Sequence, residues 1–417
     1  MTSRIWWRIA WRNLGRNRRR TALTASALTF GFVASVLMIG YMHGMMEELV
    51  SNGTRVATGQ VQIHAADYEP ERSIHRTLGG REGLDVGALL AAVEGQDGVV
   101  GAAPRLYGGG LVSSGDETVG GILMGVDPVR EAEVSRFGSS MVAGRMPGPG
   151  EIALGDAMAE AVEAEVGGEV VLVAPAADGS TGNDLFTVSG IFSVGVGAFD
   201  DSYALLELGT LAELMAMGPG RIHEVAVSVD RVRESEEPAD RIREAAVAIA
   251  SDLRTEPWSV LQPQLFFIVT YAESMNWVVA AFIFGMAAFG VANAMLLATF
   301  ERRREFGVAR ALGTSGLSVG RIVVYEGILL GLLSLGAGLV LAIPLMIYLY
   351  ENPIDLSQFV DTYSFGGSAV RPMLTVEYSV VGPMVSAIAL VITGIVAALL
   401  PAWRAVRVPP ADSLANR

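Results

Sequence analysis

Four long runs of uncharged, mostly apolar residues divide the chain. They are Thr21–Met46, Ser274–Phe300, Gly327–Tyr350 and Tyr378–Trp403, with 26, 27, 24 and 26 residues. Each run is long enough to cross a bilayer as a helix, which takes about 20 apolar residues. The pattern therefore predicts four transmembrane helices, which we place at residues 21–46, 274–300, 322–350 and 378–403.

The segment between the first two runs has a different pattern. Short runs rich in β-branched residues predict strands at Gln60–His64, Val119–Val126, Glu169–Val173, Phe186–Val194, Tyr203–Leu208 and Glu224–Val229. Helical spacing predicts helices at Asp85–Val93, Asp156–Val166 and Ala239–Leu253. We therefore expect an α-helical membrane protein with a large mixed α/β domain at residues 47–270, between the first and second spans.

The distribution of charge predicts the orientation in the membrane. Seven arginines and no acid lie in residues 1–20, five arginines and two acids in 301–321, and three arginines and one acid after Trp403. Arginines in short segments beside a span stay in the cytoplasm. We therefore expect both termini, the loop 301–316 and the tail 404–417 inside, and the α/β domain and the short loop 351–377 outside.

The first 20 residues interleave arginines with Trp6, Trp7 and Trp11. This pattern predicts an amphipathic helix at the inner membrane surface. It acts either as a topology anchor or as a contact for a partner or for moving helices. The uncharged run that follows is longer than the 7–15 apolar residues of a signal peptide, so we expect an uncleaved span.

The sequence offers no pattern for catalysis. The chain has no cysteine, and its four histidines lack metal-ligand spacing. The ATP-binding motif G-x-x-x-x-G-K-[ST] does not occur in it. We expect a chain that is not an enzyme and that holds no cofactor or metal of its own.

Two features inside or beside the spans raise hypotheses. Glu326, an ionisable residue within the third span, is expected to pair with Arg321 or with an arginine of another segment. Met38, Met42 and Met45 share one helical face near the end of the first span. That face either packs against a neighbouring helix or forms one wall of a cavity for apolar cargo.

Three motifs resemble the MacB/FtsX family of ABC transporter permeases, also called type VII or mechanotransmission transporters. They are RIAWRNLGRNRRRTALT at Arg8–Thr24, ERRREFGVARALGTSGLSVGRIVVYEGILLGLL at Glu301–Leu333, and PAWRAVRVPPADSL at Pro401–Leu414. The segment leading into the second span is similar to the lipoprotein-releasing LolC/LolE branch.

This resemblance implies a permease subunit of the bacterial inner membrane, with the α/β domain in the periplasm. Because the chain begins almost at its first span, ATP and Mg²⁺ are expected on a separate ATPase subunit in two copies, beside a second permease that is identical or related. The loop 301–316 is then the coupling helix that docks on the ATPase. The residues assigned to it are Arg302, Arg303, Arg304, Glu305, Phe306, Arg310, Leu312 and Gly313.

The leading hypothesis for function is extraction of lipoproteins from the outer leaflet of the inner membrane and handover to a periplasmic carrier. One alternative is tripartite efflux of a peptide, toxin or antibiotic. Another is mechanical activation of a periplasmic cell-wall hydrolase without transport. Membrane lipids are expected partners and nucleic acid is not. The proposed apolar entrance for cargo is lined by Met38, Met42, Met45, Phe266, Phe267 and Met275.

Overall fold

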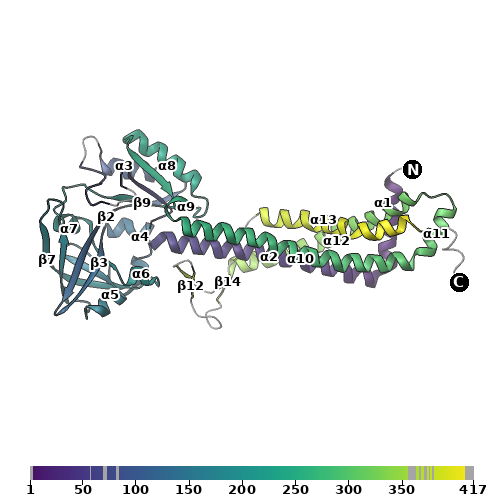
Figure 1. Ribbon diagram of the computed structural model, residues 1–417, viewed down its shortest axis with the longest axis horizontal. Coiled ribbons are helices and arrows are strands. Elements are labelled where there is room, and N and C mark those ends of the chain that lie inside the picture. Colours follow the sequence, from purple (N-terminus) through teal and green to yellow (C-terminus); the bar gives the residue numbers. More distant parts are fainter. Residues whose placement is uncertain are drawn as a thin grey trace. The chain divides into compact units, whose positions relative to one another are not determined.

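The computed structural model describes residues 3–56, 58–68, 73–80, 84–355, 363–365, 368–370, 373–374, 376–377 and 380–408. The chain divides into two compact units (Figure 1). The membrane unit comprises Met1–Met45, Thr270–Gln358 and Met373–Arg417, and the α/β unit comprises Met46–Val269 and Phe359–Pro372. Most of the predicted loop 351–377 and the end of the predicted tail, 409–417, lie outside the described residues.

The α/β unit is built from strands with helices between them. Its strands are β1 Val61–Ala65, β2 Val99–Ser114, β3 Glu117–Val126, β4 Met141–Gly144, β5 Glu151–Gly155, β6 Glu169–Pro175, β7 Thr181–Phe192, β8 Tyr203–Glu207, β9 Glu224–Val229 and β10 Leu253–Pro257. Its helices are α3 Val86–Glu94, α4 Pro128–Val134, α5 Asp156–Ala161, α6 Gly197–Asp200, α7 Leu208–Leu214, α8 Glu236–Ile249 and α9 Trp258–Leu261. The predicted mixed α/β class is confirmed.

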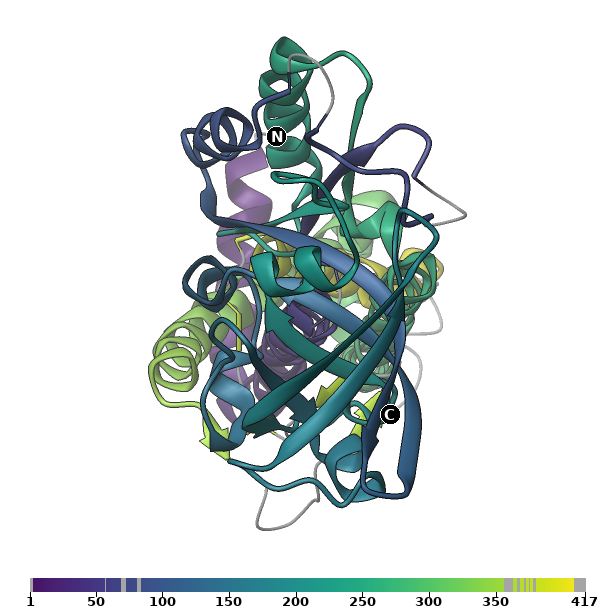
Figure 2. The same ribbon diagram turned by 90° about the vertical axis from the view of Figure 1, so that its left-hand side faces the viewer.

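The strands of this unit form one sheet in the order β10-β1-β9-β2-β3-β8-β5-β7-β4. Strand β6 pairs with both β2 and β7, so β2, β3, β8, β5, β7 and β6 close a ring (Figure 2). Leu106, Leu154 and Leu172 belong to the buried core of this ring. A second core forms where β1 and β9 meet α3 and α8, and it includes Ile63 and Ile242. The single sheet thus serves two apolar cores.

Each of the six predicted strands coincides with an observed one, but the longest strand, β2, was not predicted. It contains Pro104 and the glycines Gly108–Gly110, residue types that are depleted in strands. Its pairing with β3, β6 and β9 supplies the hydrogen bonds that compensate for this weak local preference. The helix predicted at Asp156–Val166 ends earlier, at Ala161.

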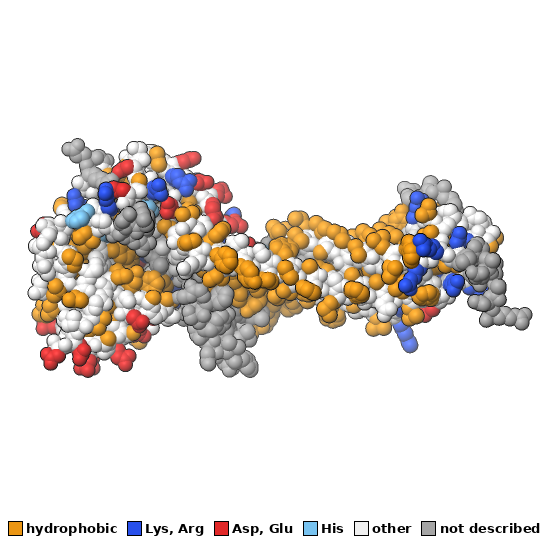
Figure 3. All heavy atoms as spheres, viewed as in Figure 1, with side chains coloured by type: hydrophobic (Ala, Val, Ile, Leu, Met, Phe, Trp, Pro, Cys, Tyr) orange, Lys and Arg blue, Asp and Glu red, His pale blue; other side chains and the backbone are white. Residues whose placement is uncertain are grey.

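The membrane unit is helical over most of its described length. Its elements are α1 Ser3–Arg16, α2 Arg18–Val56, α10 Pro263–Glu301, α11 Arg303–Ala311, α12 Gly316–Glu351 and α13 Val381–Val406, with the short strand pairs β11 Ile354–Asp355 with β14 Met373–Leu374 and β12 Tyr363–Phe365 with β13 Ser368–Val370. Helices α2 and α10 each cross the boundary between the units. Helices α2, α10, α12 and α13 are long and apolar enough to cross a membrane, in agreement with the four predicted spans. Figure 3 shows the hydrophobic side chains along these helices.

The helices begin and end away from the limits of the uncharged runs. Helix α1 ends at Arg16, so Arg18–Arg20 belong to α2 and not to the predicted amphipathic helix. Helix α10 begins at Pro263, well before Ser274, and α12 begins at Gly316. Hydropathy marks the part of a helix that suits a bilayer, whereas the helix itself continues until its hydrogen bonds end.

Helices α12 and α13 approach closely through glycines. A Cβ on Gly327 would lie 2.5 Å from the carbonyl oxygen of Gly394, and a Cβ on Gly394 would lie 2.7 Å from that of Gly327. Gly327 and Gly331 form a G-x-x-x-G pattern, which lets membrane helices pack backbone against backbone. Nearby, the hydroxyls of Ser35 and Ser386 are 3.0 Å apart and hydrogen-bond α2 to α13.

Candidate coupling site

Helix α11 is a short helix held between two sharp turns. Only Arg302 separates it from α10. At its other end the amide of Thr314 donates to Ala309 O at 3.0 Å and the amide of Gly313 donates to Arg310 O at 3.0 Å. Gly313 has a φ of +93°, so the end of α11 is a Schellman motif. Glycine at this position therefore ends the helix.

Helix α11 has a buried side and an exposed side. Phe306 is 5% exposed and packs in the helical core, where the guanidinium of Arg302 lies 5.0 Å from the centre of its ring. Phe306, one of the residues assigned to the coupling helix, therefore lies on the buried side of α11. Arg304, Val308 and Leu312 follow one another at intervals of four, and all three are exposed. They form the outward face of α11, with Leu312 83% exposed.

Glu326 is the centre of a buried polar contact between helices. Arg302 donates from Nη1 to Glu326 Oε1 at 2.8 Å, and Asn13 donates from Nδ2 to the same oxygen at 2.6 Å. Glu326 is only 8% exposed, so this pairing compensates for the loss of its hydration. Of the two partners considered, the arginine of another segment is correct and Arg321 is not. Asn13 was not predicted.

Two further ion pairs tie the N-terminal segment to the region of α11. Arg16 Nη2 lies 2.7 Å from Glu305 Oε1, and Arg20 Nη1 lies 2.6 Å from Glu301 Oε2. Burial raises the pKa of Glu305, but the hydrogen bond and charge of Arg16, with a smaller part from Arg302, outweigh it and hold the pKa below its ordinary value. The N-terminal segment thus contacts the helices beside it. Arg16, Arg20 and Glu301 were not among the predicted site residues.

Arg310 faces inward and fastens α11 to the end of α13. Its Nη1 donates to Val406 O at 3.3 Å and to Val408 O. Carbonyl groups at the end of a helix have no partner within the helix, and an arginine can satisfy them. The structure therefore divides the predicted coupling residues. Arg302, Phe306 and Arg310 hold α11 in place, whereas Arg303, Arg304 and Leu312 face outward.

The residues predicted to line a cargo cavity lie in both units. Met38, Met42 and Met45 are half-buried on α2, and Met275 on α10 is 42% exposed. These four belong to the membrane unit, whereas Phe266 and Phe267 belong to the α/β unit. Phe266 is 45% exposed and Phe267 is 68% exposed. The cavity stays a prediction.

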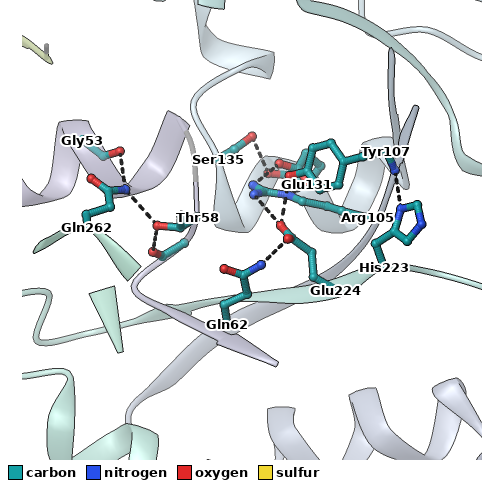
Figure 4. A network of polar contacts seen from close by, with 11 residues as sticks. Gly53, Thr58, Gln62, Arg105, Tyr107, Glu131, Ser135, His223, Glu224 and Gln262 are labelled. Carbon is teal, nitrogen blue, oxygen red and sulfur yellow. Dashed lines mark hydrogen bonds and ion pairs between the residues drawn. The ribbon is translucent and has the colours of Figure 1, made fainter. Parts of the chain in front are cut away.

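A second polar cluster lies inside the α/β unit (Figure 4). Arg105 on β2 has no exposed side-chain area and donates to Glu131 of α4 at 2.7 and 3.2 Å. It also lies 3.7 Å from Glu224 of β9, which accepts hydrogen bonds from Gln62 and, at 2.9 Å, from the hydroxyl of Tyr107. A buried charge needs such partners. The cluster joins β1, β2, β9 and α4, and we assign it a structural role.

His223 belongs to the same cluster. Its Nδ1 accepts a hydrogen bond from the amide of Tyr107 at 2.9 Å, and its Nε2 lies 3.2 Å from Ile74 O. Nε2 therefore carries the proton and the ring is neutral, because protonation of Nδ1 would remove the acceptor for Tyr107. Burial lowers the pKa of His223, and the contact with Ile74 O offsets this only in part.

Two family models match the chain. The MacB-like periplasmic core domain matches residues 21–245, and the FtsX-like permease C-terminal domain matches residues 277–410. The first match alone covers more than half of the chain, and the second includes α11 and the helices on both sides of it.

Individual relatives have low sequence identity but long alignments. The lipoprotein-releasing system transmembrane protein LolC of Neisseria meningitidis is 24% identical over 77% of this chain and 75% of its own length. LolE of Haemophilus influenzae is 21% identical over 98% of both chains. The macrolide export ATP-binding/permease protein MacB of Nitrobacter winogradskyi is 24% identical over 98% of this chain and 60% of its own length.

Among solved structures, the periplasmic region of MacB from Actinobacillus actinomycetemcomitans matches 50% of this chain and 94% of its own, with a TM-score of 0.37 and 13% identity. The first family model covers the first span and most of the α/β unit, and the second covers the helices that follow. By the matches to the two family models, the chain belongs to the MacB/FtsX family of ABC transporter permeases.

Proposed function

We propose that this chain is the transmembrane permease subunit of an ABC transporter, and that α11 receives motion from a separate ATPase subunit in the cytoplasm. The observation that carries the proposal is the two-sided character of α11. Its outward face presents Arg304, Val308 and Leu312, while Arg302 and Arg310 hold its inner side to α12 and α13. A helix built in this way can be pushed without separating from the helices that it must move.

The connections around α11 suit the transmission of a displacement. One residue joins it to α10, and the turn at Gly313 joins it to α12. The contact of Arg302 with Glu326 fixes the junction of α10 and α11 against α12. Because these connections are short and are held by an ion pair and hydrogen bonds, a displacement of α11 would tilt α10 and α12 together. Helix α10 continues into the α/β unit, where the motion would act in the periplasm.

Charge and family membership support the proposed orientation and partners. Arginines at this end of the spans favour the cytoplasm. ATP and Mg²⁺ would bind to the ATPase subunits, which we propose in two copies beside a second permease, identical or related. The outward face of α11 would meet a groove with an apolar floor and an acidic rim, because that chemistry complements Leu312 and Arg304.

The proposed docking is tested by binding of the purified full-length permease to the ATPase subunit with which it co-purifies from native membranes. Leu312→Ser and Arg304→Glu should each weaken this binding by about tenfold or more, as expected for a central apolar anchor or a charge reversal at an interface. Arg19→Glu, an exposed charge reversal outside α11, is the matched control. Binding unchanged in both α11 variants would show that this face is not the docking site.

We further propose that the cargo is a lipidated protein extracted from the outer leaflet of the inner membrane. The support is the similarity to LolC and LolE, whose names state lipoprotein release. Exposed Phe266, Phe267 and Met275 provide apolar surface on α10 that suits an acyl chain. Met38, Met42 and Met45 add flexible, polarizable side chains on α2.

The similarity to a macrolide exporter favours efflux as a second candidate. Mass spectrometry of the complex purified from native membranes separates the two. Lipoproteins that co-purify with the wild type and are depleted by Phe267→Ser would support lipoprotein release. Val129→Ser in α4, which removes another exposed apolar side chain, is the control and should retain them. Recovery of the ATPase without lipoproteins, together with ATPase stimulation by a soluble compound, would favour efflux.

A further inference from the structure

Three arginines at the start of α11 and the end of α13 line one pocket. The pocket has a volume of about 320 Å³, and its lining includes Arg303, Arg404 and Arg407 together with Phe300 and Trp403. All three arginines are exposed. Within the described part of the chain, none of the three forms an ion pair with a carboxylate. The pocket therefore carries positive charge that no described acidic residue neutralises.

Three other arginines at this end of the membrane unit do form ion pairs with carboxylates. Arg16, Arg20 and Arg302 each pair with a glutamate at 2.7, 2.6 and 2.8 Å. The acidic residues of this region thus pair with those arginines, and none of them is among the residues that line the pocket. The pocket thus gathers three guanidinium groups without a carboxylate partner, which is a property expected of an anion-binding site.

Aromatic rings position two of the three guanidinium groups. Arg407 lies 3.9 Å from the centre of the Trp403 ring, and Arg404 lies 5.7 Å from the centre of the Phe300 ring. Such cation–π contacts hold a guanidinium by its face and leave its N–H edges available for hydrogen bonds. Two guanidinium groups held in this way suit the tetrahedral oxygens of a phosphate, which arginine binds in a bidentate manner.

The depth of the pocket follows from the limits of the apolar runs. Phe300 is the last residue of the uncharged run 274–300, and Trp403 is the last residue of the run 378–403. Both rings are about half exposed, at 55% and 51%. Aromatic residues at the end of a span mark the headgroup level of the bilayer, where arginines just beyond them meet the lipid phosphates.

Apolar surface continues from the pocket along both helices. Leu297, one turn before Phe300, is 58% exposed, and Leu400, one turn before Arg404, is 46% exposed. A soluble anion would gain nothing from these side chains, whereas the acyl chains of a lipid would cover them. The surroundings of the arginines therefore distinguish a lipid from a free phosphate.

We propose that this pocket binds the headgroup of an anionic phospholipid, with its acyl chains against the exposed sides of α10 and α13. Arg303 is also the first residue of α11. A bound headgroup would thus touch the start of the coupling helix and make its position sensitive to the lipid composition of the leaflet. The site does not require an ATPase partner, so it can be tested independently of the proposed docking.

The test uses the purified full-length chain in detergent, mixed with equal amounts of phosphatidylglycerol and phosphatidylcholine and analysed by native mass spectrometry. The wild type should retain phosphatidylglycerol in preference to phosphatidylcholine by about tenfold, because both lipids carry a phosphate but only phosphatidylglycerol has a net negative charge for the arginines to neutralise. The double variant R404Q/R407Q should lose this preference. R18Q/R19Q removes the same charge from exposed positions outside the pocket and should keep it.

Three results would overturn the proposal. Equal retention of both lipids by the wild type would mean that no headgroup site exists. An equal loss of preference in R404Q/R407Q and R18Q/R19Q would reduce the effect to general surface charge. Displacement of the lipid by millimolar inorganic phosphate would identify a free-anion site. If R404Q/R407Q unfolds, the single variants R404Q and R407Q are measured instead, and retention of the full preference in both would count against the site.

Discussion

Arg302 and Glu326 form an ion pair between the end of α10 and the first turns of α12, with Nη1 and Oε1 2.8 Å apart. Asn13 of α1 donates to the same oxygen, so three helices meet at one carboxylate. The contact lies beside α11 and is shielded from solvent, since the two side chains are 12% and 10% exposed. It joins α11, which we propose is displaced by the ATPase, to α10 and α12, which would carry that displacement.

Replacing one partner of this ion pair should reduce the stability of the folded chain more than replacing both. Arg302→Gln leaves Glu326 buried with a single neutral donor, and we expect a loss of stability of about 3 kcal/mol. The double variant Arg302→Gln/Glu326→Gln leaves no unpaired charge and should recover part of that loss. Thermal unfolding of the purified chain measures both.

Arg321→Gln is the matched control for this prediction, because Arg321 is exposed and is not the partner of Glu326. Its melting temperature should stay close to that of the wild type. Strictly additive losses in the double variant would show that the Arg302–Glu326 pair contributes nothing specific.

The turn after α11 depends on the left-handed backbone at Gly313. No atom lies within 4 Å of a Cβ built there, so Gly313→Ala meets a conformational cost and no clash. That cost is about 1 kcal/mol, and Gly313→Asn should cost less because asparagine tolerates this conformation. The melting temperature and the ATPase rate of the assembled complex should fall in the order Gly, Asn, Ala.

Gly336→Ala is the control for the turn, since Gly336 lies inside α12 and also has open space around its Cβ. Alanine favours a helix interior over glycine, so this variant should be as stable as the wild type or more so. A Gly313→Ala variant as stable as Gly336→Ala would show that the left-handed turn is not required.

The close approach of α12 and α13 should not tolerate a side chain at Gly394. A methyl group there would meet the carbonyl oxygen of Gly327 at 2.7 Å, which forces the helices apart. We expect Gly394→Ala to destabilise the chain by about 1–3 kcal/mol, the range for overpacking in a well-packed interior. Gly290→Ala in α10 has no neighbour within 4 Å and should be tolerated. Similar melting temperatures for the two variants would contradict the close packing.

The α/β unit should lose stability as the solution becomes mildly acidic. Burial depresses the pKa of His223 below its ordinary value of 6.5 in the folded chain. The unfolded chain therefore binds a proton more readily, so the contribution of neutral His223 is present above about pH 6.5 and is lost as the pH falls through the lower folded pKa.

The pH dependence is measured as the melting temperature of the α/β transition between about pH 8 and 5, a range that brackets the titration of histidine. His223→Gln should flatten the decline, because glutamine does not titrate. His75→Gln, at an exposed histidine, should leave the decline intact. A decline of equal slope in His223→Gln would assign the effect to other groups.

Local properties of the sequence were sufficient for several features. The length and apolarity of four runs are enough to predict four spanning helices, because each residue of such a run is transferred to lipid largely independently of the others. The end of α11 at Gly313 is also local, since only glycine adopts that backbone conformation without strain. Strands such as β3 and β9 were predicted correctly because their residue pattern is also a local property of the sequence.

Other features depended on which surfaces pack together. Strand β2 has a weak local preference and exists because three neighbouring strands bond to it. Phe306 and Leu312 were both assigned to the coupling helix, but helix packing buries Phe306 and leaves Leu312 exposed. Hydropathy identifies both residues as apolar and does not tell which of them meets another helix.

The clearest division concerns Glu326. Its position within the predicted third span indicated from sequence alone that it needs a polar partner, because an unpaired carboxylate in a bilayer is costly. Arg321 precedes it by five residues on the same helix, a spacing that turns the two side chains to different sides. Only the packing of α1 and α10 against α12 brought Asn13 and Arg302 within 2.6 and 2.8 Å of that carboxylate. The sequence by itself determined the need for a partner, and the tertiary structure decided its identity, because contacts between distant segments depend on the packing of whole helices.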